Sequence, residues 1–159
     1  MTSADNVIVA VLVLGFILWR QLRPRAVRED SPFRLMLVLG VVGVADVAGF
    51  ADGHHVTGAA WTLLAASLMV GAVLGVMRGA SVRIWRRDGV LVRQGGAVTV
   101  ALWVAGLGVH VLVDVVIHGV DRSAAGIGTD AILLYLAVAL AAQRLVTLTR
   151  AQHLAAAAA

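Results

Sequence analysis

The sequence lacks cysteine and lysine and carries little charge of either sign. Without cysteine the chain forms no disulfide, no cysteine-ligated zinc site and no covalent attachment to a c-type haem. Charged residues make up 14% of its 159 residues, whereas a soluble domain usually has about 25%. Hydrophobic residues reach 60%. So short and so apolar a chain is expected to have lipid rather than water as its solvent.

All 13 basic residues are arginine, in a chain rich in alanine, valine, glycine and leucine. We interpret this usage as a GC-rich coding bias rather than as a requirement for phosphate binding. The net charge of +4 is compatible with nucleic-acid binding. However, the arginines lie in short segments between apolar stretches, where they set membrane topology. The expected partner is therefore the lipid bilayer and not a nucleic acid.

Five apolar stretches predict an all-α fold, a polytopic membrane bundle of about five transmembrane helices within a single domain, residues 1–159. A helix that spans the bilayer needs about 20 apolar residues. No basic residue precedes the first stretch, so we expect a retained helix there and not a signal peptide. The expected spans are Asn6–Trp19, Phe33–Phe50, Ala59–Met77, Val98–His118 and Ile127–Leu148.

The arginines predict how these spans are oriented. Twelve of the 13 fall on one side of the expected bundle, and only Arg122 falls on the other. Cytoplasmic loops of membrane proteins carry an excess of arginine and lysine. We therefore expect a multi-pass protein of the plasma membrane, the inner membrane of the cell, with its N-terminus outside and its C-terminus in the cytoplasm. The arginines on the cytoplasmic side are Arg20, Arg23, Arg25, Arg28, Arg34, Arg78, Arg83, Arg86, Arg87, Arg93, Arg144 and Arg150.

The segment between the third and fourth spans contains a turn signal. Asp88-Gly89 stands between two short runs with alternating apolar residues, a pattern typical of a β-hairpin. We expect a short cytoplasmic hairpin with Trp85 at the lipid surface. An irregular basic loop is the alternative.

Glycines at four-residue spacing mark the third span. Gly71, Gly75 and Gly79 form a stripe on which a second helix backbone can approach closely. We expect this packing within the bundle, with a homodimer through the same stripe as the alternative. Small residues on the second and fifth spans offer partner surfaces: Gly40, Gly43, Ala137 and Ala141.

Histidines and acids gather toward the expected outer side. His110, Asp114 and His118 follow one another at four-residue steps, which place them on one slowly drifting face of the fourth span. Ionisable groups at that depth are costly unless they face protein or water. We therefore predict an outward-facing polar pocket, to which Asp46, Asp130, His54 and His55 also contribute.

Three functions are compatible with such a pocket. It would bind a transition metal through His110, Asp114, His118, Asp46 and Asp130. It would instead bind a b-type haem through two histidines on different helices, for example His110 or His118 with His54 or His55. Alternatively, Asp46, His110 and Asp114 would carry a cation or proton in a small transporter or channel subunit. In the third case His110 and Asp114 only satisfy each other and a neighbouring helix, in a ligand-free structural accessory subunit. We favour a metal- or haem-handling accessory of membrane electron-transport machinery, acting with other membrane proteins.

Enzyme signatures are absent from the sequence, since it has no HExxH, GxSxG or P-loop motif. An enzyme is therefore the less favoured class. Ser67 is an isolated hydroxyl within the third span, and we expect it to bond its own helix.

Residues 71–103, GAVLGVMRGASVRIWRRDGVLVRQGGAVTVALW, combine a glycine-rich helix end, a basic turn with Asp-Gly and a helix containing Leu-Trp. This stretch resembles the CcdC-like membrane protein family, which is associated by name with cytochrome c biogenesis, and an actinobacterial member would fit the composition. The resemblance implies a small multi-span scaffold near electron-transport machinery and transfers no catalytic motif. Its matching positions are Gly71, Gly75, Arg78, Gly89 and Trp103.

Overall fold

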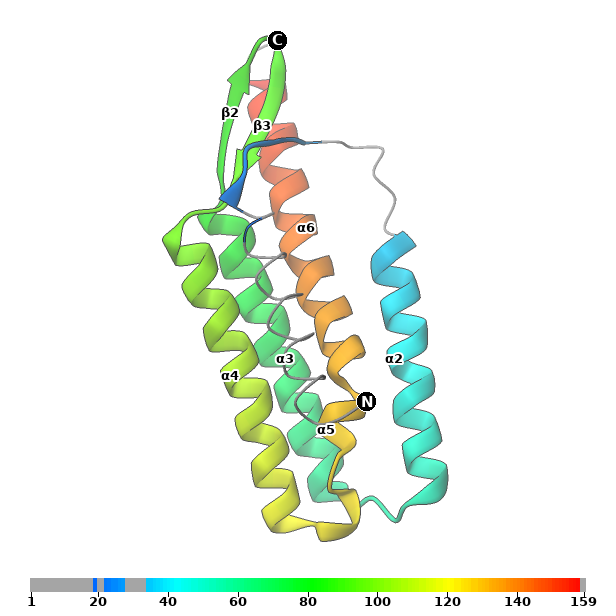
Figure 1. Cartoon of the computed structure of the whole chain (residues 1–159). Coiled ribbons are helices and arrows are strands. Elements are labelled where there is room, and N and C mark those ends of the chain that lie inside the picture. Colours follow the sequence, from blue (N-terminus) through cyan, green and yellow to red (C-terminus); the bar gives the residue numbers. More distant parts are fainter. Residues whose placement is uncertain (1–18, 20–21, 28–33, 158–159) are drawn as a thin grey trace.

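The computed structural model describes residues 19, 22–27 and 34–157, which form an all-α bundle topped by a small sheet (Figure 1). Within this part of the chain, four helices are long and apolar enough to cross a membrane. The predicted second, third and fourth spans are thereby confirmed, and the fourth of these helices covers most of the predicted fifth span. Apart from Trp19, the predicted span Asn6–Trp19 lies outside the described residues. The elements are β1 (Arg25–Ala26), α2 (Arg34–Gly53), α3 (Gly58–Ser81), β2 (Arg83–Arg87), β3 (Val90–Gln94), α4 (Ala97–Val120), the 3₁₀ helix η1 (Arg122–Ala124), α5 (Ile127–Asp130) and α6 (Ile132–Ala156).

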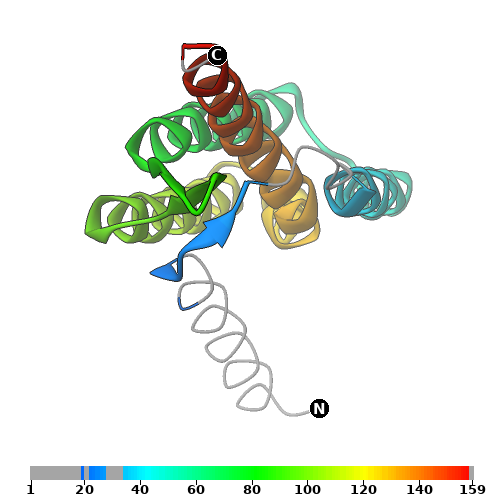
Figure 2. The same ribbon diagram turned by 90° about the horizontal axis from the view of Figure 1, so that it is seen from above.

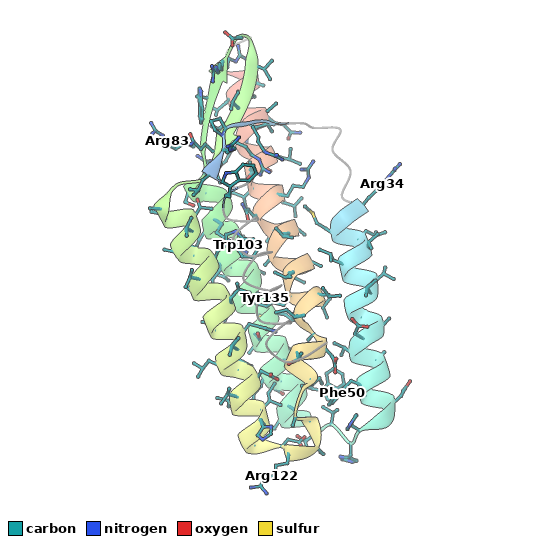
Figure 3. The ribbon with its side chains drawn as sticks, in the orientation of Figure 1. Arg34, Phe50, Arg83, Trp103, Arg122 and Tyr135 are labelled. Atoms are coloured by element: carbon teal, nitrogen blue, oxygen red, sulfur yellow. The ribbon has the colours of Figure 1, made fainter. Side chains whose placement is uncertain are left out.

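Helix α6 is the hub of the bundle. It packs most extensively against α3, and α2 packs on it from another side, as the view down the bundle shows (Figure 2). Helix α4 packs on α3. We call the end of the bundle that carries β2 and β3 the hairpin end, and the opposite end, with residues 54–57 and 121–126, the loop end. Arg34 and Arg83 lie at the hairpin end, and Arg122 lies at the loop end (Figure 3).

Small residues allow both contacts of α6. The glycine stripe of α3 faces α6 of the same chain: a Cβ atom on Gly71 would meet the ring of Tyr135, and one on Gly79 would lie 2.7 Å from the carbonyl oxygen of Gln143. On the other side, Gly43 of α2 lies directly against the backbone of Leu134. The expectation of packing within the bundle is confirmed. Because Gly71, Gly75 and Gly79 are covered by α6, this stripe does not present a free face to a second copy of the chain.

The predicted hairpin is present. Asp88 and Gly89 both have positive φ, +51° and +78°, as a two-residue turn of this kind requires. Arg87 and Val90 close the turn as cross-strand partners. The structure adds an unpredicted third strand, since β1 pairs antiparallel with β3 and places Arg25 opposite Arg93.

The fifth predicted span, Ile127–Leu148, is interrupted. It begins as the single turn α5, passes through Ala131, and continues as α6. Gly126 initiates α5 with a φ of +98°, a conformation that glycine adopts without strain. The prediction of one continuous helix was therefore wrong at Ala131. Just before this interruption, the carbonyl oxygen of Gly128 lies 3.0 Å from Nε2 of His110.

Candidate functional site

His110 lies at the centre of a buried polar cluster between α3, α4 and α5. Its side chain is only 3% exposed. Nε2 lies 3.0 Å from the carbonyl oxygen of Gly128, and Nδ1 lies 3.1 Å from Oγ of Ser67. Since a carbonyl can only accept, Nε2 carries a proton, and in the neutral ring Nδ1 accepts from the Ser67 hydroxyl. Both nitrogens of the imidazole are thus bonded within the chain.

Ser67 therefore differs from its expected role. Its hydroxyl does not bond its own helix but joins α3 to α4 through His110. The prediction for this residue was wrong because a hydroxyl inside a bundle can satisfy a neighbouring helix as readily as its own. The ring of Tyr135 also lies against the imidazole, with the centroids 4.5 Å apart.

Tyr135 extends the polar cluster toward the hairpin end. Its hydroxyl donates to the carbonyl oxygen of Gly106 on α4 at 2.8 Å, and the side chain is 2% exposed. Figure 3 shows this ring in the interior of the bundle, with Trp103 nearer the hairpin end. The hydroxyl thus finds an acceptor one turn before His110, where the absence of a side chain on Gly106 leaves room for it.

Asp114 holds the other side of Gly128. Its Oδ1 accepts the N–H of Gly128 at 3.0 Å, and Oδ2 accepts from the hydroxyl of Thr129 at 3.4 Å. The carboxylate is packed so closely that a Cβ atom on Gly128 would overlap it. His110 and Asp114, one turn apart on α4, thus fix α5 through one glycine. A contact of both side chains with a neighbouring helix was one of the alternatives that the sequence left open, but the backbone of Gly128 was not predicted as their shared partner.

The remaining predicted ligands lie away from this cluster. His54 stacks on Phe50 with its Nδ1 3.0 Å from the Phe50 carbonyl oxygen, at an exposed position. His55, His118 and Asp46 have exposed side chains, and Asp130 is half-buried. Among residues 19, 22–27 and 34–157, no three histidines and acids are grouped so that they could hold a metal ion.

The cluster does not fit a metal or a haem. An imidazole ligates through a nitrogen lone pair, and in His110 one nitrogen bears a proton for Gly128 while the other accepts from Ser67. Ligation would break one of these buried bonds. Metal and haem binding through His110 remain predictions that the geometry of the described residues does not support.

A second polar junction, which the sequence analysis missed, closes the loop end. Asp121 follows α4 and accepts from the N–H of Thr57 at 3.0 Å, which ties the start of α3 to the end of α4. It also accepts from the hydroxyl and the N–H of Ser123. These hydrogen bonds, that of the Ser123 hydroxyl first, hold the pKa of Asp121 well below its ordinary value. The signal available in the sequence was Asp-x-Ser, a turn-capping pattern.

Comparisons of the chain with protein-family models, with curated proteins and with solved structures found no match.

Proposed function

We propose that the protein is a multi-span membrane accessory protein in which the cluster around His110 is an internal support for the helix bundle and carries no prosthetic group. One observation carries this proposal: both imidazole nitrogens of His110 are bonded within the chain, to Ser67 and to Gly128. A group that is satisfied on all sides stabilises and positions helices, whereas a ligand site keeps a lone pair available.

The geometry favours this role over a proton or cation pathway. A relay needs a continuous row of groups that can both give and take a proton. Between Asp114 and His110 the connection passes through the N–H and the carbonyl of Gly128, which are fixed backbone groups. The acid and the imidazole therefore share a partner without being able to exchange a proton through it.

The placement of the protein is part of the same proposal. We infer that the hairpin end faces the cytoplasm of the plasma membrane, because the described arginines concentrate there and Arg122 lies at the loop end. We further propose membership of the CcdC-like family, in which the protein would work beside other membrane proteins of electron transport. The resemblance at Gly71, Gly75, Arg78, Gly89 and Trp103 supports it, and in the fold these positions serve helix packing and the hairpin turn.

Metal analysis and an absorption spectrum of the detergent-purified full chain test the absence of a prosthetic group. The expected result is no Soret band and far less than one metal ion per chain, for the wild type and for His110→Gln alike. A Soret band, or one metal per chain that is lost in His110→Gln and kept in His118→Gln, would overturn the proposal. His118 is the matched control because it lies on the same helix and is exposed.

Single cysteines test the orientation cleanly, since the natural chain has none. Val90→Cys places a thiol at the hairpin, and Gly119→Cys places one at the loop end, where nothing lies within 4 Å of the new Cβ. In intact cells a membrane-impermeant maleimide should label only the Gly119→Cys variant. Labelling of Val90→Cys before permeabilisation would reverse the proposed orientation.

A further inference from the structure

Arg78 is a cation buried inside a membrane-spanning helix. It lies in the last turn of α3, three residues before the helix ends at Ser81, and its side chain is only 2% exposed. At a rise of about 1.5 Å per residue, it is about 4.5 Å inside the helix end. The sequence analysis counted Arg78 among the loop arginines that set topology, so its burial within α3 is a correction. An arginine at that position needs a partner within the protein or from outside it.

The neighbouring aromatic ring supplies only part of that need. The guanidinium carbon lies 4.0 Å from the centre of the Trp103 ring on α4. Among the described residues, neither Nε of Arg78 nor Nε1 of Trp103 has a hydrogen-bond partner, although both atoms are buried. These two contacting side chains therefore each bury a donor, one of them on a charged group, that has no acceptor among the described residues.

The end of α3 does not provide the acceptor. Its terminal carbonyls are already engaged, because Arg150 of α6 donates to those of Gly79, Ala80 and Val82 at 2.7–2.9 Å. The carbonyl of Arg78 itself accepts from the hydroxyl of Ser81. Arg150 also adds a second positive charge to this end of the helix.

The described acids do not provide the counter-charge either. Asp88 sits at the tip of the hairpin, 93% exposed and 3.7 Å from Arg87. Asp114 and Asp121 lie toward the loop end, where they accept hydrogen bonds from the N–H groups of Gly128 and Thr57, respectively. Within the described part of the chain, no carboxylate forms an ion pair with Arg78, and a buried charge without compensation is strongly unfavourable.

We propose that Arg78 and Trp103 form a binding site for a phosphate oxyanion, taken from the headgroup of a phospholipid in the leaflet at the hairpin end or from free phosphate. The guanidinium matches phosphate oxygens with its planar fork of donors, and the indole N–H adds one more. Because Arg78 lies in the last turn of α3, a bilayer spanned by this helix would bring its headgroup boundary close to the guanidinium. A buried water would satisfy the donors but would leave the charge uncompensated.

The test uses the detergent-purified full chain and two matched pairs of probes. The first pair is short-chain phosphatidylglycerol against phosphatidylcholine at equal mole fraction, and the second is sodium phosphate against sodium chloride at equal ionic strength. Binding is measured as a saturable rise in melting temperature. Trp103 fluorescence, in a Trp19→Phe, Trp61→Phe, Trp85→Phe background, reports the site directly. A response to phosphatidylglycerol assigns the headgroup as the source, and a response to phosphate assigns the free anion.

Variants locate the response. Arg78→Gln should weaken the apparent affinity about 10-fold to 100-fold, the range expected for loss of hydrogen bonds to a charged group. Arg83→Gln is the matched control: Arg83 lies at the same end of the molecule and lines a pocket of about 330 Å³ with Trp85 and Gln94, so it offers the competing anion site. The affinity of the Arg83→Gln variant should stay within about two-fold of that of the wild type, because Arg83 does not contact the Arg78–Trp103 site.

Arg78→Lys and Trp103→Phe keep the test decisive if Arg78→Gln does not fold. Each removes part of the donor set, the fork or the indole N–H, and each should weaken the melting-temperature response. The proposal is overturned if the wild type responds to neither probe, if both of these variants respond as the wild type does, or if Arg83→Gln abolishes the response while Arg78→Gln retains it.

Discussion

His110 and Asp114 bind the same residue, Gly128, from its two sides: the imidazole donates to its carbonyl, and the carboxylate accepts from its N–H. One glycine thereby connects two successive turns of α4 to the short helix α5. The absence of a side chain on Gly128 is required, because a Cβ atom there would overlap the Asp114 carboxylate. The cluster acts as a joint between helices α3, α4 and α5.

Replacing His110 by alanine should destabilise the bundle by about 2–4 kcal/mol. Two interhelical hydrogen bonds at about 1 kcal/mol each are lost, together with the packing of the ring on Tyr135. His118→Ala, at an exposed site on the same helix, should change stability by less than about 0.5 kcal/mol. Reversible unfolding of the two variants in mixed micelles measures both values, and equal effects would contradict the assignment of His110 as a joint.

Asp114→Asn and His110→Ala should not be additive. Both side chains act on Gly128, so the second substitution should cost less once the first has released α5. A double-mutant cycle should give a coupling energy of about 0.5–1.5 kcal/mol, as residues with a shared partner usually do. A coupling near zero would show that the two side chains act independently.

Gly75→Ala should separate α3 from α6. A Cβ atom at this position would overlap the carbonyl oxygen of Ala139 and lie 3.0 Å from Cβ of Ala142, so two backbones would have to move. We expect a loss of about 1–3 kcal/mol. Gly108→Ala, in α4 with nothing within 4 Å, is the control and should stabilise its helix by up to about 1 kcal/mol. A stabilising effect at both positions would argue against close packing at the glycine stripe.

Arg150→Gln should loosen the end of α3. The guanidinium donates to three terminal carbonyls at 2.7–2.9 Å, and these charge-assisted bonds contribute about 1–3 kcal/mol together. Hydrogen exchange of residues 78–82 should accelerate in the variant. Arg86→Gln, at the exposed hairpin, serves as the control and should leave that exchange unchanged.

The stabilisation that Asp121 gives to the loop end should depend on pH. Its pKa is lowered by the hydrogen bonds from Ser123 and Thr57, so the folded state favours the carboxylate. The contribution to stability is therefore complete above the ordinary pKa of 3.8 and is lost as the pH falls below that value. The stability difference between the wild type and Asp121→Asn should shrink on acidification. A difference that is constant down to pH 2 would contradict this assignment.

The spans and the hairpin follow from local pattern. Length and hydropathy define a membrane helix because the bilayer, not the rest of the chain, sets the requirement. Asp88-Gly89 defines the hairpin because few residue pairs tolerate positive φ at both positions of a tight turn. By contrast, the pairing of β1 with β3 joins residues 66 to 68 positions apart, and no local pattern predicts it.

The candidate site was predictable only in part. Steps of four residues advance a helix by about 400°, so the face drifts by about 40° per step. Asp114 still faces the bundle with His110, while His118 has turned away and is exposed. The break before α6 also had no sequence signal, because it falls where the Gly128 carbonyl is bonded to a side chain 18 residues earlier.

Helix α6 holds α3 on one side and α2 on another, yet it is synthesised after both. Only 11% of the apolar stretch of α2 is buried, and its principal contacts are with α6 and α5. During biogenesis α3 and α4 can associate as soon as α4 has entered the bilayer, whereas α2 must wait in lipid until the C-terminal helix arrives. A ribosome that stalls before residue 132 would therefore leave in the membrane an α3–α4 pair whose glycine stripe is uncovered.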